Sequence, residues 1–176
     1  MDKQMYDSIW HALADHLKRG TAPASGLLAC AAENPGDGEY IISENKVSLN
    51  PGDSLPDGNC VVTGKIHIPD EALPDGYERT FLVDFGKRNG QFFVNGELYH
   101  GVDANRRFLP IRDEWKGQTV DIKIIAKGNS QFGYLGTTVI DKEVQALLYT
   151  FNIVLNYFAT EDGGKYMENR VIDGRM

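Results

Sequence analysis

Five side chains that can recognise or react with a ligand fall within one stretch of eight residues. They are His100, Asp103, Asn105, Arg106 and Arg107, which supply an imidazole, a carboxylate, an amide and two guanidinium groups. Sugar recognition uses such groups, because hydroxyls both donate and accept hydrogen bonds and planar side chains can satisfy them in pairs. This loop is therefore the candidate ligand-binding site.

The same loop also has a purely structural interpretation. Asp103 and Asn105 are residue types that cap turns with their own side chains, and the two arginines can pair with nearby carboxylates. Loops of this composition are common on protein surfaces. Tyr99 and Phe108 flank the loop and could offer an apolar surface to a sugar face. From the sequence alone both interpretations stay open.

Neither catalysis nor metal binding is predicted for these residues. Asp84, Glu97 and Asp103 are close in sequence, as the paired carboxylates of a glycoside hydrolase would require, but Asp84 lies in an apolar strand pattern and Glu97 follows a turn. His100 and Asp103 make only two of the ligands that a metal site needs. The remaining histidines fall in unrelated segments: His11, His16 and His67. We expect no catalytic residue, no metal and no cofactor in this chain.

The loop must be positioned by the stretch 80–111, around which the chain is organised. Two pairs, Asn89-Gly90 and Asn95-Gly96, can supply the positive φ angles that tight hairpin turns need. They separate an apolar run at 81–85 from two short, aromatic-rich strands. The pattern predicts a β-meander that leaves the sheet through the candidate loop.

The other strand signals extend over most of the chain. Turn residues recur between 34 and 58, and side chains alternate at 60–68 and 119–126, followed by irregular Gly-rich chain to about Gly136. Recurring turns and alternation are typical of an all-β domain. We therefore expect a mainly β fold, an antiparallel β-sandwich of jelly-roll or galactose-binding-like type, over residues 23–139.

Helical patterns flank the expected sandwich. Residues 1–22 are predicted to form an amphipathic helix, and residues 140–176 a helical connector that opens with Asp141 as its N-cap. A second apolar side of this connector is formed by residues spaced four apart: Tyr149, Ile153 and Tyr157. A helix apolar on two sides is usually buried on more than one of them. We expect a partner there, either a missing domain or a second copy of the chain in a homo-oligomer.

Composition excludes several classes of function. The chain has 176 residues, enough for one domain, with 18 basic and 25 acidic residues and a formal net charge of −7. It has no basic stripe suited to nucleic acid, and no apolar run near the roughly 20 residues of a membrane span. The N-terminus lacks a secretory signal pattern, and Cys30 and Cys60 form no disulfide framework. We expect a cytoplasmic protein that binds neither nucleic acid nor membranes.

Residues 83–107 resemble part of a known enzyme family. Val-Asp-Phe-Gly at 83–86, followed at 91–107 by Gln-Phe-Phe-Val-Asn-Gly-Glu-Leu-Tyr-His-Gly-Val-Asp-Ala-Asn-Arg-Arg, is similar to the N-terminal β-sandwich of the zinc-dependent α-mannosidases of glycoside hydrolase family 38. The segment 140–149 is similar to the helix that leads from that sandwich towards the catalytic barrel. The likeness covers roughly residues 60–160.

The resemblance implies a non-catalytic accessory domain that packs against the catalytic domain of the same polypeptide, in an enzyme that acts on α-mannosides. The family's catalytic domain opens with a histidine–any–aspartate zinc motif. No histidine here is followed two residues later by Asp; those positions hold Leu13, Lys18, Pro69 and Val102. We therefore expect the zinc site to lie outside this chain, in a longer protein of which the chain is an N-terminal part. The alternatives are a stand-alone carbohydrate-binding module and a small enzyme that uses the carboxylates of the meander.

Overall fold

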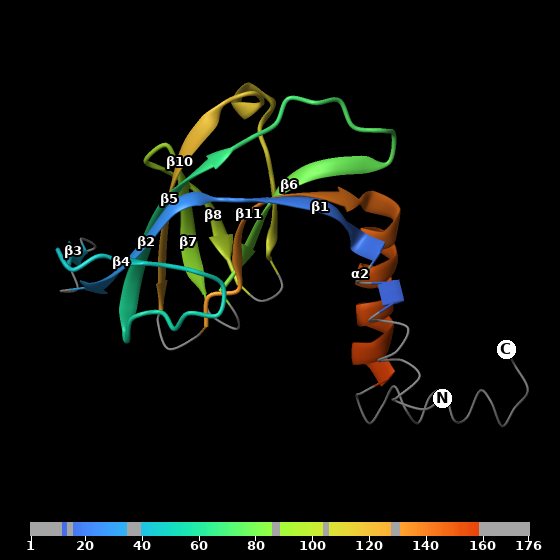
Figure 1. The fold of residues 1–176 in the computed structure, drawn as a ribbon. Coiled ribbons are helices and arrows are strands. Elements are labelled where there is room, and N and C mark those ends of the chain that lie inside the picture. The colour runs from blue at the N-terminus through green and yellow to red at the C-terminus, as the bar shows by residue number, and fades with distance from the viewer. Residues whose placement is uncertain are drawn as a thin grey trace, which may run out of the picture. The chain divides into compact units, whose positions relative to one another are not determined.

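The structure is a computed structural model and describes residues 12–13, 16–34, 40–85, 89–103, 106–127 and 131–158 (Figure 1). Within these ranges the fold is mainly β. Its elements are β1 (Lys18–Pro23), β2 (Ser25–Glu33), β3 (Ile41–Ile42), β4 (Val47–Ser48), β5 (Asn59–His67), β6 (Tyr77–Asp84), β7 (Gly90–Val94), β8 (Glu97–Val102), β9 (Phe108–Pro110), the 3-10 helix η1 (Asp113–Trp115), β10 (Thr119–Lys127), β11 (Tyr134–Asp141) and α2 (Lys142–Phe158).

The strands form two sheets. One has the order β1-β11-β6-β9, and the other follows the path β3-β2-β5-β10-β7-β8, with β4 paired to β2 beside it. The longest pair, β5 with β10, is antiparallel and places Lys65 opposite Asp121. Buried side chains from both sheets belong to one apolar cluster. The fold is thus the antiparallel β-sandwich that the turn signals and alternation predicted.

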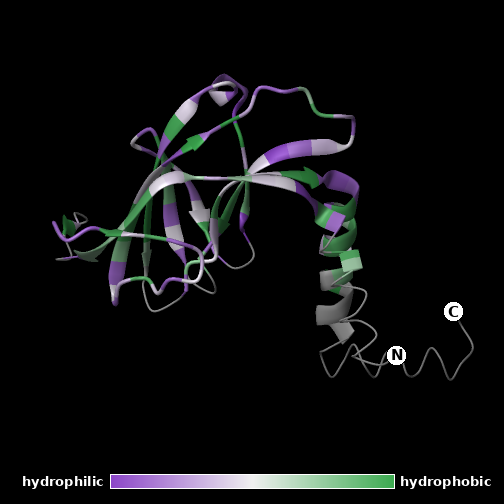
Figure 2. Ribbon diagram, viewed as in Figure 1, coloured by the Kyte–Doolittle hydropathy of each residue, from purple (hydrophilic) through white to green (hydrophobic). Residues whose placement is uncertain are grey.

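The core is built from alternate residues of facing strands. In β10 the side chains of Ile122 and Ile124 are buried, whereas Asp121 and its outward neighbours are not, and Figure 2 shows this alternation along the strands. From the four-stranded sheet, the Phe81 ring lies 5.2 Å from the ring of Phe92 in the other sheet. Burying each such side chain stabilises the fold by roughly 1.5–3 kcal/mol, so these contacts hold the two sheets together.

The predicted meander is wrong at its first turn. β6 belongs to the four-stranded sheet and β7 to the seven-stranded one, so the chain crosses between sheets where a hairpin was expected at Asn89-Gly90. The second turn is a true hairpin: Asn95 and Gly96 have φ angles of 51° and 86° and connect β7 to β8. In both sheets of a sandwich, every second side chain of a strand points into the core. The alternation of apolar and polar residues therefore does not reveal which sheet a strand joins.

The helix expected over residues 1–22 is wrong in its C-terminal part. Helical residues at 12–13 and 16–17 are followed at once by β1, an edge strand beside β11. Gly20 is a strand residue with a φ of 107°. Pairing with a strand far along the chain overrides the local helical pattern. β11 likewise begins at Tyr134, in a stretch predicted to be irregular; residues 1–11 lie outside the described ranges.

The last strand passes into α2 without a loop. Asp141 Oδ1 accepts hydrogen bonds from the backbone N–H groups of Glu143 and Val144 at 3.0 and 3.2 Å, so the predicted N-cap is confirmed. The chain divides into two compact units, one holding Gly20–Pro74 and Arg79–Val139 with the core, and the other containing α2. No helix within the described ranges is long and apolar enough to cross a membrane.

The second apolar side of α2 is exposed where the structure describes it. Tyr149 is 69% exposed and Ile153 is 53% exposed, and Leu147, on a different side of the helix, is 51% exposed. On the other side of the helix Leu148 is buried. The side chain of Tyr157 lies outside the described residues.

Candidate functional site

Asp103 accepts the hydrogen bonds that fold the candidate loop into a turn. Its backbone carbonyl and its Oδ1 both accept the N–H of Arg106, at 3.1 and 2.9 Å. Its Oδ2 accepts Arg106 Nε at 2.8 Å and pairs with Nη2 at 2.6 Å. The Asp103 side chain is 18% exposed and that of Arg106 is 65% exposed. The carboxylate is therefore fixed by charge-assisted bonds within its own turn.

Arg107 points to a different carboxylate. Its Nη1 lies 3.4 Å from Oδ2 of Asp84, the last residue of β6. Its carbonyl oxygen accepts the N–H of Val83 at 2.9 Å, so side chain and backbone both tie the loop to β6. The Asp84 carbonyl in turn accepts the N–H of Gly133 at 2.9 Å. Asp84 thus joins three segments that are distant in sequence.

His100 and Tyr99 lie beside a small aromatic cluster. His100 Nδ1 is 2.7 Å from the carbonyl oxygen of Gly101, which places the proton on that nitrogen. The Tyr99 hydroxyl donates to the carbonyl of Pro110 at 3.1 Å, and its ring meets Trp115 at 4.9 Å between centroids, nearly edge to face. The guanidinium of Arg112 lies 5.1 Å from both ring centroids. The apolar surface expected from Tyr99 is therefore shared with a cation.

The candidate side chains do not converge on one point. Asp103 pairs with Arg106, Arg107 pairs with Asp84, and His100 bonds its own neighbour's carbonyl. Asn105 lies outside the described residues, and Phe108 is partly buried. These contacts match the structural interpretation of the loop, while a role in ligand binding stays a prediction. Among the described residues, no three His, Cys, Asp or Glu side chains are grouped as a metal site would need.

Both cysteines are buried free thiols on paired strands. Cys30 Sγ lies 3.5 Å from the carbonyl oxygen of Val61, its partner across the β2–β5 pair. Burial raises the pKa of the Cys60 thiol from 9.0 to about 11, and the neighbouring Cys30 adds to the rise. Both thiols are therefore packed as small apolar side chains.

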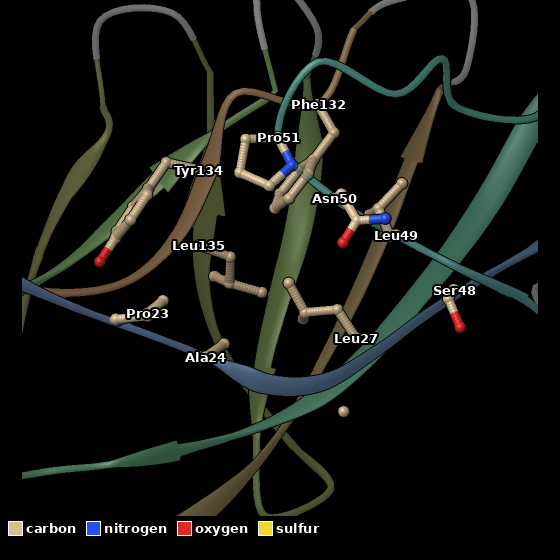
Figure 3. Close-up of a pocket in the computed structure, with 11 residues that line it drawn as sticks. Pro23, Ala24, Leu27, Ser48, Leu49, Asn50, Pro51, Phe132, Tyr134 and Leu135 are labelled. Atoms are coloured by element: carbon tan, nitrogen blue, oxygen red, sulfur yellow. The ribbon is translucent and has the colours of Figure 1, made fainter.

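A pocket that the sequence did not predict opens at one edge of the sandwich (Figure 3). Its volume is about 340 Å³. Three separate segments contribute to its lining: Pro23, Ala24, Gly26, Leu27, Ser48, Leu49, Asn50, Pro51, Phe132, Tyr134 and Leu135. The pairing register of β2 with β5 shifts between Ser25 and Leu28, beside the pocket. The Asn50-Pro51-Gly52 turn is the nearest signal in the sequence, and it does not by itself indicate a pocket.

The wall formed by the turn is held by hydrogen bonds to two neighbours. Asp53 Oδ2 accepts the backbone N–H of Asn50 at 2.7 Å. The N–H of Gly52 donates to the carbonyl of Phe132 at 2.7 Å, and the N–H of Phe132 donates to the carbonyl of Asp53 at 2.9 Å. Ser54 and Gln131 add an antiparallel bridge. This wall is therefore fixed before any ligand arrives.

Among the residues that the structure describes, none that lines the pocket is charged, although 24% of the chain is charged. Leu27 and Leu135 lie at its centre in Figure 3, with Pro51 and Phe132 on one side and Pro23 and Tyr134 on another. Partial burial raises the pKa of the Tyr134 phenol, so this ring is also neutral at physiological pH. The arrangement can bind a neutral molecule but offers no charged acid or base for chemistry.

Comparison with known proteins gives no assignment: no family model, curated protein or solved structure matches this chain.

Proposed function

We propose that this chain is a non-catalytic β-sandwich domain of an α-mannosidase of the glycoside hydrolase family 38 type. In this proposal it packs against the catalytic domain of the same polypeptide and supports it. The proposal starts from the resemblance of residues 83–107 to that family. The zinc that the resemblance implies belongs to the catalytic partner, as does the hydrolysis of α-mannosides.

The observation that carries the proposal is the exposed apolar side of α2. Tyr149 and Ile153 are four residues apart, hence on one side of the helix, and both are more than half exposed. Burying a large apolar side chain is worth roughly 1.5–3 kcal/mol, so such a pair favours contact with another surface. The resemblance places this helix between the sandwich and the catalytic barrel, which makes the catalytic domain the partner.

The loop supports a non-catalytic role. Asp84 and Asp103, two of the three carboxylates considered for catalysis, are each paired with an arginine. Both pairs hold the loop to itself or to β6, which is an ordinary structural role. We further propose a cytoplasmic location, which the two free cysteines support.

A binding experiment in trans tests the proposal. The 176-residue chain is mixed with a family 38 catalytic domain produced without its own sandwich, and the affinity is measured by surface plasmon resonance. The double variant Tyr149→Lys/Ile153→Lys should weaken binding by about tenfold or more.

A matched control comes from two equally exposed apolar residues of the sheet. Ile41 is 62% exposed and Val47 is 55% exposed, so Ile41→Lys/Val47→Lys makes the same chemical change elsewhere and should leave the affinity unchanged. Absence of binding at micromolar concentrations, or an equal loss in both double variants, would refute the proposal.

A further inference from the structure

We infer that the edge pocket is a binding site for a small, uncharged molecule made of a single ring that carries a hydroxyl group. Alicyclic alcohols and pyranose sugars share this chemistry. The pocket lies wholly within the unit that holds the sandwich core, and it involves neither α2 nor the candidate loop.

The size and lining of the pocket set the class of ligand. Ligand pockets typically measure about 300–1,000 Å³ and are mostly apolar with a few placed polar groups. At about 340 Å³ this pocket suits one ring and not a chain of them. The described lining residues carry no charge and offer an ionised ligand no counter-charge, which favours a neutral ligand.

The Asn50 side chain selects a hydrogen-bond donor. Its amide nitrogen donates to Asp53 Oδ2 at 3.3 Å, on the same carboxylate oxygen that accepts its backbone N–H at 2.7 Å. This bond uses one N–H of the amide and fixes the side chain, and Figure 3 shows the amide oxygen turned towards Leu27. An amide oxygen accepts and does not donate, so the matching ligand group is a neutral hydrogen-bond donor, of which a hydroxyl is the simplest.

The rest of the pocket fits the apolar face of a ring. Leu27 and Leu135 form the centre, and Pro23, Pro51 and Tyr134 bound it with flat, rigid rings. The Pro51 wall is tied to the segment just before β11 through the Gly52–Phe132 hydrogen bond at 2.7 Å. A preformed wall loses little conformational entropy on binding, which favours a ligand as small as one ring.

Titration of the full chain, followed in ¹H–¹⁵N correlation spectra, tests the inference. Cyclohexanol should shift the amides of residues 24–28, 48–52 and 132–135 together. Cyclohexanone has the same ring but no donor, and should bind about fivefold more weakly, as expected for the loss of one hydrogen bond. Cyclohexylammonium and cyclohexanecarboxylate should bind more weakly than either. Shifts centred outside these residues, or equal affinities for the alcohol and the ketone, would overturn the inference.

Substitution of Asn50 separates its role from simple packing. Asn50 is exposed, so Asn50→Leu should fold normally and bind cyclohexanol and cyclohexanone equally. Asn45→Leu makes the same change at another exposed asparagine outside the pocket and should keep the preference for the alcohol. If the preference persists in Asn50→Leu, the hydroxyl is not read by Asn50 and the assignment fails.

A sugar arm distinguishes the two sources of the ligand. Methyl α-D-mannopyranoside presents hydroxyls on a ring of similar size. Binding at the same residues with at least the affinity of cyclohexanol identifies the ligand as a pyranose. Binding of cyclohexanol alone identifies it as an alicyclic alcohol, and binding of neither refutes the site.

Discussion

Replacement of Asp103 by alanine should destabilise the domain by about 2 kcal/mol. A hydrogen bond to a charged group contributes about 1.5–3 kcal/mol, and Asp103 accepts one from the backbone N–H of Arg106 at 2.9 Å. The guanidinium contacts add less, because Arg106 is 65% exposed and its charge is rehydrated when the carboxylate is lost. For a chain of this size, about 2 kcal/mol lowers the melting temperature by roughly 4–8 °C.

Urea unfolding followed by far-ultraviolet circular dichroism measures this loss, and two further variants identify its origin. Asp103→Asn keeps an oxygen for the backbone bond but loses the charge, so it should fall between the native chain and Asp103→Ala. Asp113 and Lys116 form a second acid–base pair with the same three-residue spacing, at 2.6 Å, and Asp113 is 91% exposed. Asp113→Ala should therefore leave stability unchanged. If Asp103→Ala is no more destabilising than Asp113→Ala, the turn is not held by the carboxylate.

Four other outcomes follow from the same structure. The unmodified chain should self-associate in sedimentation velocity runs through α2, and Tyr149→Lys/Ile153→Lys should make it monomeric; a clean monomer before substitution would contradict this. It should not hydrolyse aryl α-mannosides with or without zinc, and measurable turnover would show the non-catalytic assignment to be wrong. Gly136→Ala should lower the free energy of unfolding by about 1–3 kcal/mol, because a Cβ there would overlap the carbonyl oxygen of Ala22. An unchanged melting temperature would mean that β1 moves to make room for the methyl group. Folding raises the pKa of Cys60, so the folded state holds this proton more tightly than the unfolded state does. The free energy of unfolding should therefore fall as pH rises from 9.0 towards about 11, and in the Cys60→Ala variant it should fall less steeply.

The fold class could be predicted from the sequence because each strand obeys a local rule. Ile122 and Ile124 alternate with polar residues, and Asn95-Gly96 has the two positive φ angles of a tight turn. The choice of sheet could not be predicted in the same way. β6 and β7 are both inward-alternating strands separated by a turn-like pair, and their assignment depends on distant partners, β11 for one and β10 for the other.

Part of the candidate loop could be predicted from the sequence, whereas the pocket could not, and the physical reasons differ. The pairing of Asp103 with Arg106 is local in sequence, so the sequence itself indicated a turn. Arg107 reaches Asp84 across the fold, and that partner was not identifiable beforehand. The pocket is made of ordinary residues such as Leu27 and Leu135, which gain significance only where three segments meet.

The position of β11 has a consequence for folding during synthesis. This strand lies between β1 and β6, so neither of them can complete its pairing until the chain has been made as far as Asp141. At about 5–20 residues per second, the ribosome needs roughly 5–20 s to pass from the end of β1 to the start of β11. Throughout that interval β1 lacks its partner in the sheet, and from its own synthesis onwards one edge of β6 stays open to other chains. The sandwich should therefore close late on the ribosome, in one step. Nascent chains that end before residue 141 should depend on chaperones to avoid aggregation.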